Sequence, residues 1–278
     1  MIYNLTVPAI KAVFFDLGGT LWAPFGDRAR QEVLEEATRE LVREVYRVLR
    51  ESIEPEVFMA SLKGKIDGLK DVPSPGLQED ILRELTSLRR RANLDPESLP
   101  NLSLFREVDF SATVRDSLKD AGVTLDADRV AQVASHFAAA LCAGYKTYPD
   151  TLDALDTLKE RGFIVGVVSN TSIPPEIIDR YLLESGILER VDFRVLSSET
   201  GWRKPHPAIY REALDRAGAS PCETLFVGDR FLEDVAGPKS VGMKAALCRV
   251  EGPSPGGVPE EFLPDLQVLD LHELLANI

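Results

Sequence analysis

The sequence has little cysteine: its 278 residues include only Cys142, Cys222 and Cys248. Three widely spaced cysteines cannot form a disulfide framework, and no CxxC pair indicates a zinc site. We therefore expect these cysteines to be small buried residues of a protein kept in a reducing compartment.

Long hydrophobic runs are also missing. The longest mostly apolar stretch, 133–145, contains His136 and is shorter than the roughly 20 residues that a membrane helix requires. The first residues lack a basic leader, and Lys11 and Asp16 interrupt what would be the apolar part of a signal peptide. We expect a soluble, cytoplasmic protein with no membrane partner.

The sequence has fewer basic than acidic residues: 32 Lys and Arg against 45 Asp and Glu give a formal net charge of −13. A sequence-independent nucleic-acid binder or a protein that binds anionic membranes needs basic surface, so both classes are disfavoured. An anionic substrate is still compatible, because a bound metal ion can supply positive charge locally.

Two kinds of pattern alternate along the chain. Residues 11–20 combine a short apolar run with Asp and two Gly, which predicts a buried strand that ends in a turn. Helical periodicity then dominates until about residue 141 and predicts helices near 28–50, 55–65, 77–91, 111–121 and 127–142. After Pro149, helices at 150–161, 175–185, 207–217 and 231–240 alternate with the apolar runs FIVGVVSN, DFRVLS, TLFVGD and KAALCRV.

This alternation predicts βαβ units and a parallel open sheet. The first strand must join the later strands, since a single strand cannot bury both its faces. The predicted fold class is therefore α/β, a doubly wound, Rossmann-like parallel sheet core with an inserted all-α cap domain. We expect the core at 1–24 and 146–278 and the cap at 25–145.

Polar residues follow the predicted strands, at the edge where an open parallel sheet binds its ligands. They are Asp16, Ser169 with Asn170, and Asp229, and Lys204 follows a fourth strand in the loop GWRKPHP. Each has an ordinary alternative as a turn residue, a helix cap or a surface lysine. Together, a carboxylate, a hydroxyl, a lysine and further acids are suited to phosphoryl transfer through an aspartyl phosphate.

The same ordered set resembles the haloacid dehalogenase superfamily. FFDLGGTL resembles its first motif, VVSN its second, the lysine of RKP its third and VGDRFLEDVAG its fourth. The separations are 153 residues from Asp16 to Ser169, 35 from there to Lys204 and 25 from there to Asp229. The first interval holds the helical cap that many members insert, so the resemblance covers 11–27 and 144–250.

The resemblance implies a role for each matching residue. Asp16 would be the nucleophile and a ligand of Mg²⁺, and Thr20 would orient its loop. Ser169 would bind the phosphate, with Asn170 beside it. Lys204 would pair with both the phosphate and the nucleophile.

The fourth motif supplies the other metal-binding groups that the resemblance implies. Asp229 resembles a metal ligand, and Asp234 an acid that contacts the metal through another ligand or a water; the family spacing favours Asp234 over the adjacent Glu233. No Cys or His lies at these positions, so a hard cation such as Mg²⁺ fits better than zinc. Residues of the cap and its borders would set specificity, with Trp22 and Arg28 as the predicted substrate contacts.

One position departs from the family pattern. Phosphatases of this superfamily usually carry a second Asp two residues after the nucleophile, as general acid and base, and here that position is Gly18. Its backbone carbonyl could still bind the metal, but it has no proton to transfer. Either another acid replaces it, or the substrate has a good leaving group, or the protein binds without turnover.

The sequence thus predicts a magnesium-dependent phosphatase that hydrolyses a small phosphorylated metabolite through an aspartyl phosphate on Asp16, acting as a monomer or homodimer. The alternatives are a non-catalytic binding or regulatory protein of the same fold and a 2-haloacid dehalogenase. The dehalogenase is disfavoured because those members need no metal, whereas Asp229 and Asp234 are retained here.

Overall fold

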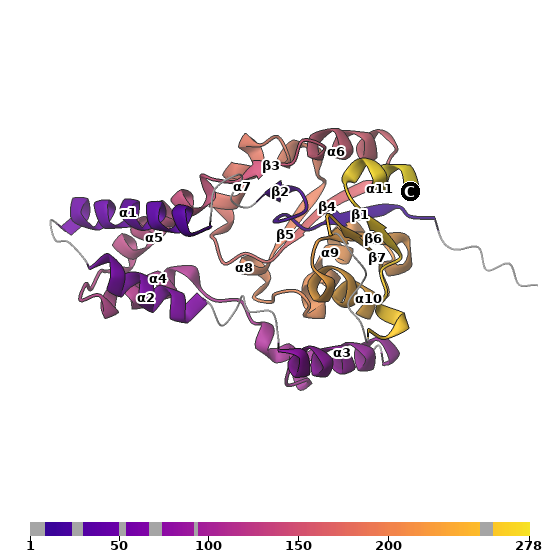
Figure 1. Cartoon of the computed structure of the whole chain (residues 1–278), viewed down its shortest axis with the longest axis horizontal. Helices are drawn as coiled ribbons and strands as arrows, with labels where there is room; N and C mark the ends of the chain where they lie inside the picture. Colours follow the sequence, from indigo (N-terminus) through magenta and orange to yellow (C-terminus); the bar gives the residue numbers. More distant parts are fainter. Residues whose placement is uncertain (1–8, 24–29, 50–53, 67–73, 92–93, 251–257) are drawn as a thin grey trace, which may run out of the picture.

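The computed structural model describes residues 9–23, 30–49, 54–66, 74–91, 94–250 and 258–278. It has two lobes, one built on a sheet and the other made of helices (Figure 1). The helical lobe contains α1 (Arg30–Leu49), α2 (Pro55–Ile66), α4 (Phe110–Asp120) and α5 (Ala127–Cys142). All four match helices predicted from the sequence.

The sheet lobe contains six strands in the order β5-β4-β1-β6-β7-β8. Every neighbouring pair is parallel, which confirms the predicted α/β fold class. The strands are β1 (Ala12–Phe15), β4 (Ile164–Ser169), β5 (Phe193–Leu196), β6 (Thr224–Gly228), β7 (Lys244–Cys248) and β8 (Leu266–Val268). Strand β1 is central, because Ala12 pairs with both Ile164 of β4 and Thr224 of β6.

Helices cover both faces of this sheet. Side chains alternate along a strand, so Phe14 packs into one hydrophobic cluster with α9, while Val13 and Phe15 pack into another with α6, α7 and α11. The covering helices are α6 (Thr151–Glu160), α7 (Pro175–Glu184), α9 (Pro207–Ala217) and α11 (Leu271–Asn277). The sheet is therefore doubly wound, as predicted.

Several short elements were not predicted. Strand β8 has three residues, and β2 (Trp22–Ala23) pairs with β3 (Lys146–Thr147) in a two-stranded antiparallel sheet where the chain leaves and re-enters the sheet lobe. The helix predicted at 231–240 is a π-helix, η6 (Phe231–Ala236), followed by α10 (Gly237–Ser240). The remaining short segments are η2 (Pro96–Ser98), η3 (Leu102–Phe105), η4 (Leu188–Arg190), α8 (Ser197–Thr200), η5 (Pro221–Glu223) and η7 (Glu260–Phe262).

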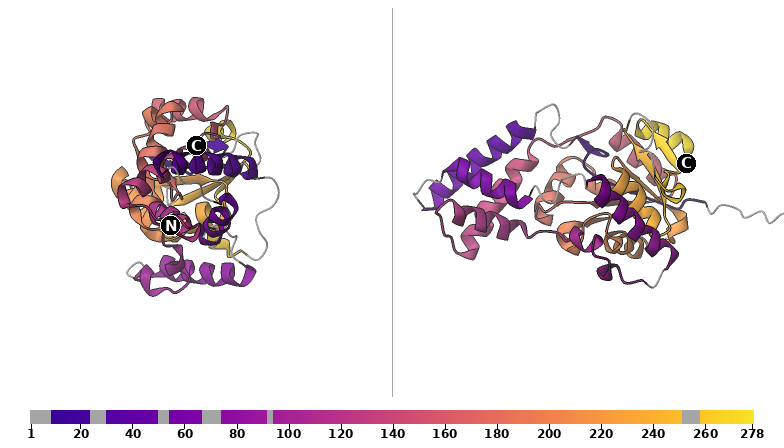
Figure 2. Two further views of the ribbon diagram at one scale, coloured as in Figure 1. Left: turned by 90° about the vertical axis from the view of Figure 1, so that its left-hand side faces the viewer. Right: turned by 60° about the horizontal axis from the view of Figure 1, so that its bottom comes forward.

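The insertion does not pack as one unit. Helix α3 (Pro75–Arg90) lies against the sheet lobe, away from the other helices of the insertion (Figure 2). Its buried side chains Ile81 and Leu85 share a hydrophobic cluster with Leu232 and Phe262 of the sheet lobe. The part of the predicted 25–145 cap that includes α3 is thus packed on the core.

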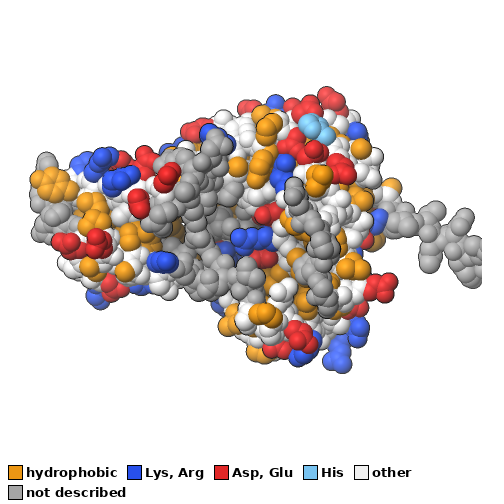
Figure 3. Space-filling view, viewed as in Figure 1, with side chains coloured by type: hydrophobic (Ala, Val, Ile, Leu, Met, Phe, Trp, Pro, Cys, Tyr) orange, Lys and Arg blue, Asp and Glu red, His pale blue; other side chains and the backbone are white. Residues whose placement is uncertain are grey.

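Charged side chains of both signs lie on the face of the molecule shown in Figure 3. On the face in Figure 3, the described Lys and Arg side chains are interspersed with Asp and Glu, and none of the described residues there form a broad basic patch. Among the described residues, no helix combines the length and the apolar character that crossing a membrane requires.

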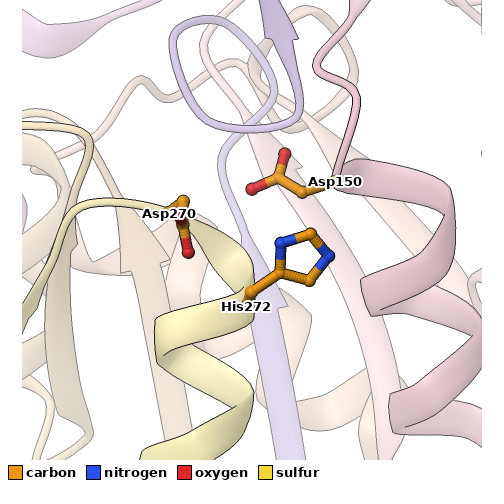
Figure 4. A group of neighbouring side chains, drawn as sticks. All are labelled: Asp150, Asp270 and His272. Atoms are coloured by element: carbon orange, nitrogen blue, oxygen red, sulfur yellow. The ribbon is translucent and has the colours of Figure 1, made fainter.

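A group of two acids and a histidine near the loop of the first motif has a structural role, because Asp150 links α11 through Arg249 to that loop. Asp150, Asp270 and His272 come together at the starts of α6 and α11 (Figure 4). Both oxygens of the buried Asp150 are engaged, one by the Arg249 guanidinium and the other by the Leu271 backbone N–H at 2.8 Å. Arg249 in turn donates to the Thr20 carbonyl at 3.0 Å. Asp150 therefore connects the start of α11 directly, and the loop of the first motif through Arg249, to the start of α6.

We expect Asp150→Ala to lower the free energy of unfolding by about 3 kcal/mol, because it leaves the Arg249 charge without its buried partner. Denaturant unfolding measures this change. Asp153→Ala, which removes an exposed partner of His272, is the matched control and should change it by less than about 0.5 kcal/mol. Equal effects of the two variants would contradict the anchoring role.

Candidate active site

The site begins where β1 ends. The Asp16 N–H donates to the Val227 carbonyl at 3.0 Å, which continues the pairing with β6 by one residue. The chain then turns sharply, and the Leu17 carbonyl accepts from the N–H groups of Leu21 and Trp22 at 2.9 and 2.7 Å. This turn holds the Asp16 carboxylate, 7% exposed as a residue, at the carboxyl edge of the sheet.

Two glycines allow the acidic residues to approach one another. Gly19 has φ +90°, and a Cβ there would lie 2.3 Å from Asp229 Oδ2. A Cβ on Gly228 would lie 2.3 Å from Asp234 Cγ. Any larger residue at either position would therefore displace an acid of the fourth motif.

Lys204 joins two of the acids. Its buried ammonium donates to Asp16 Oδ1 and to Asp234 Oδ1, each at 2.7 Å. Burial alone would lower the pKa of Lys204, but the two carboxylates outweigh it and raise the pKa above its usual value. Lys204 is therefore a fixed positive charge beside the Asp16 carboxylate.

Asn170 holds the lysine loop through its side chain. Asn170 Oδ1 accepts from the Lys204 backbone N–H at 2.7 Å, and Asn170 Nδ2 donates to the Lys204 carbonyl at 3.1 Å. Both polar atoms of this amide are engaged, so the geometry favours positioning of Lys204 over direct contact with a substrate. Ser169, the last residue of β4, precedes it and is 6% exposed.

The acids of the first and fourth motifs form one cluster. Asp16, Asp229 and Asp234 each offer an oxygen, and these atoms lie within 4.8 Å of one another. Within the described part of the chain, the buried Asp229 Oδ1 has no hydrogen-bond partner. Burial and then the Asp16 carboxylate raise the pKa of Asp229 to about 6, which indicates that negative charge is crowded here.

This oxygen set fits a hard divalent cation. Both oxygens of Asp234 already accept hydrogen bonds, from Lys204 and from the Arg230 N–H at 2.9 Å. Asp16 and Asp229 are thus the acids best able to contact a cation directly, while Asp234 orients Lys204. The π-helix that carries Asp234 is a distortion often found at functional sites.

Comparison with known proteins places this arrangement in a family. The family model for haloacid dehalogenase-like hydrolases matches residues 10–242, which include the whole cluster and Lys204. The chain belongs to the haloacid dehalogenase-like hydrolase family. The resemblance stated from the four motifs is thereby confirmed.

The hydrolase has sequence relatives that are named as phosphatases, and its fold is similar to solved structures of phosphatases and dehalogenases. Glyceraldehyde 3-phosphate phosphatase from Methanothermobacter thermautotrophicus is 37% identical over 106 residues, 38% of this chain and 46% of that protein, so the match spans about half of the relative. The structure of a phosphatase from Thermococcus onnurineus aligns with TM-score 0.57 and 22% identity, over 96% of this chain and 97% of that one. A 2-haloacid dehalogenase from Pseudomonas syringae pv. Tomato DC3000 gives TM-score 0.58 and 24% identity, over 96% and 99%. Since phosphatases and dehalogenases both have this fold, the fold alone does not distinguish the two activities.

Three further residues were predicted to belong to the site of this hydrolase: Thr20, Trp22 and Arg28. Thr20 is fully buried, which argues against substrate contact, and its hydroxyl has no hydrogen-bond partner among the described residues, so no contact supports the predicted loop-orienting role. Trp22 is 2% exposed and packs on Tyr145 with ring centroids 5.1 Å apart, where the chain leaves and re-enters the sheet lobe. Arg28 lies outside the described residues.

Gly18 leaves space at the position of the missing acid. No heavy atom of the described residues would lie within 4 Å of a Cβ there, and Gly18 is not among the glycines with positive φ. A side chain could therefore be accommodated at this position without backbone strain.

Sequence reasoning missed Arg230 and Glu107. Arg230 directly follows Asp229, its side chain is 60% exposed, and its N–H fixes Asp234. Its place in the fourth motif could have identified it. Glu107 lies in the insertion, and its buried partners are 90 and 96 residues away, so no local pattern marks it.

Proposed function

We propose that this hydrolase is a magnesium-dependent phosphatase that hydrolyses a small phosphorylated metabolite through an aspartyl phosphate on Asp16. The observation that carries the proposal is the buried Lys204 ammonium, 2.7 Å from both Asp16 and Asp234, beside the partly unsatisfied Asp229. A nucleophilic carboxylate next to a fixed cation is suited to attack on an anionic phosphate.

In the first step, the free oxygen of Asp16 attacks phosphorus and the bond from phosphorus to the leaving oxygen breaks. Lys204 stabilises the charge that develops on the phosphoryl oxygens, and the hydroxyl of Ser169, the last residue of β4, would donate to one of them. Mg²⁺, when bound by Asp16 and Asp229, would neutralise these carboxylates against the phosphate.

In the second step, water attacks phosphorus and the bond to Asp16 breaks, which releases phosphate and restores the carboxylate. The leaving oxygen of the first step must gain a proton or depart as a stabilised anion. Since Gly18 cannot supply the proton, we expect turnover to favour substrates with good leaving groups, such as acyl, aryl or anomeric sugar phosphates.

The organic part of the substrate has a candidate pocket. A cavity of about 340 Å³ opens between the first turn of α4 and the loops after β4 and β5, and its lining includes Glu107, Phe110, Ser172, Pro174, Ser198 and Gly201. Its mixed polar and apolar lining suits a small polar metabolite. The loops after β4 and β5 lie at the carboxyl edge of the sheet, the same edge as Asp16.

The test is release of inorganic phosphate from a panel of phosphorylated metabolites and an aryl phosphate, with Mg²⁺ and with a chelator. Metal-dependent release, fastest for good leaving groups, is the expected result. No release from folded protein would instead favour the binding or regulatory protein, and halide release from a 2-haloacid would favour the dehalogenase.

Metal binding has a separate readout that needs no substrate. Mg²⁺ at 100 times its Kd should stabilise the fold by about 2.7 kcal/mol, seen as a rise in Tm. Asp229→Asn should remove most of this rise, whereas the exposed control Asp153→Asn should keep it. An equal rise in both variants would show that the ion binds elsewhere.

A cytoplasmic location, a monomeric or homodimeric state and the lack of nucleic-acid and membrane partners remain predictions. Size-exclusion chromatography with light scattering tests the oligomeric state.

A further inference from the structure

A stretch of the insertion lies directly against the loop that carries Lys204. Arg203 N donates to the Phe105 carbonyl at 2.8 Å, and Glu107 N donates to the Gly201 carbonyl at 2.9 Å. Between these bonds, Arg106 and Trp202 form an antiparallel bridge. The insertion is therefore joined to the loop that carries Lys204 by an isolated β-bridge with two flanking hydrogen bonds, and three residues after Glu107 the chain enters α4 of the helical lobe.

The Glu107 side chain points inward from this pairing. It is 3% exposed, and its two oxygens accept from Nη1 of Arg203 at 2.9 and 2.7 Å. Arg203 is 11% exposed and immediately precedes Lys204. A buried ion pair with two short contacts fixes the backbone at the residue before the lysine.

The same carboxylate is linked through Ser197 to the loop after β4. Ser197 Oγ donates to Glu107 Oε2 and accepts from the Thr171 N–H, the latter at 2.8 Å. Thr171 follows Asn170, whose amide binds both backbone polar groups of Lys204. One carboxylate from the insertion thus connects, through Arg203 and through Ser197, the two loops that must align on a phosphate.

We propose that Glu107 is a positioning residue that holds the Ser169–Asn170 loop and Lys204 in register for attack by Asp16. This inference rests on the proposed phosphatase function. It assigns to the insertion a part in aligning the catalytic groups, in addition to any role in covering the substrate. Because a misplacement of about 1 Å can cost about 10²-fold in rate, loss of Glu107 should be visible in turnover.

The matched control is Glu84, another buried carboxylate of the insertion. It accepts from Leu102 N at 2.8 Å and from the backbone and side chain of Asn101 at 3.1 and 2.7 Å. These hydrogen bonds lie within the insertion, away from the loops after β4 and β5. Glu84→Gln and Glu107→Gln therefore each remove one hydrogen-bonded buried carboxylate of the insertion, but only Glu107 is paired with Arg203 and touches the catalytic loops.

The experiment measures kcat for the best substrate of the panel, inhibition by orthovanadate and Tm for both variants, with Mg²⁺ present. We expect Glu107→Gln to lower kcat by about 10- to 100-fold and to weaken vanadate inhibition in parallel. Glu84→Gln should lower Tm while kcat and vanadate inhibition stay within about twofold of the unmodified protein.

A second variant keeps the test usable if Glu107→Gln fails to fold. Ser197→Ala keeps the Glu107–Arg203 pair and removes the hydrogen bonds that link Glu107 through Ser197 to Thr171, and we expect an intermediate fall in kcat with Tm nearly unchanged. Equal kcat losses in Glu107→Gln and Glu84→Gln, or unchanged kcat in both Glu107→Gln and Ser197→Ala, would overturn the inference. If the unmodified protein releases no phosphate, the proposed function fails, a result distinct from either.

Discussion

Asp16→Asn should reduce phosphate release by at least about 10⁴-fold, because an amide cannot form the aspartyl phosphate. The substitution keeps the shape of the side chain and an oxygen that can accept from Lys204. It also relieves the repulsion between Asp16 and Asp229 that contributes to the raised pKa of Asp229. We therefore expect the variant to fold and to lose activity.

Two measurements separate this result from misfolding. The Tm of Asp16→Asn should stay close to that of the unmodified protein, and mass spectrometry after acid quench should find a phosphoryl adduct on the Asp16 peptide only in the unmodified protein. Turnover within tenfold of the unmodified protein would show that another group is the nucleophile.

Gly18→Asp should raise the rate on simple alkyl phosphates by about 10²-fold or more, within the range that a positioned general acid contributes. The substitution introduces a carboxylic acid two residues after the nucleophile, where the described residues leave open space around the Cβ. The gain should be small for aryl phosphates, since their leaving groups need little protonation. Comparison of kcat/KM for the two substrate types measures it.

Gly18→Asn is the matched control, because it has nearly the same shape but no acidic proton. An equal gain from both variants would mean that filling the space, and not proton transfer, raises the rate. A failure of Gly18→Asp to help alkyl phosphates, in protein that already hydrolyses them quickly, would mean that another acid occupies this role.

The sheet was predictable because its strands are buried on both faces. The apolar runs that contain β1, β4, β5, β6 and β7 each end in a polar or glycine residue, and parallel pairing brings those ends to one edge. Strands of two or three residues, such as β2, β3 and β8, are too short to produce a pattern. The packing of α3 on the sheet lobe was not predictable, since an apolar stripe does not specify its partner.

The candidate site was predictable in its residues and less so in their roles. Asp16, Lys204 and Asp229 could be placed together because each follows a predicted strand, and Asp234 because of its spacing in the fourth motif. Asp234 accepts from Lys204 with one oxygen and from the Arg230 N–H with the other, and the sequence alone does not predict this pairing. Glu107 could not be identified from the sequence, because its partners Ser197 and Arg203 lie 90 and 96 residues further along the chain.

The central place of β1 also sets an order of events during synthesis on the ribosome. Ala12 cannot gain both neighbours until Ile164 and Thr224 have emerged, whereas α1 and the later α5 complete much of the helical lobe by residue 142. Pairing across such long sequence separations is slow, and the nascent strand keeps both edges exposed meanwhile. The first motif is thus translated early but becomes part of a folded sheet only when nearly the whole chain has been made.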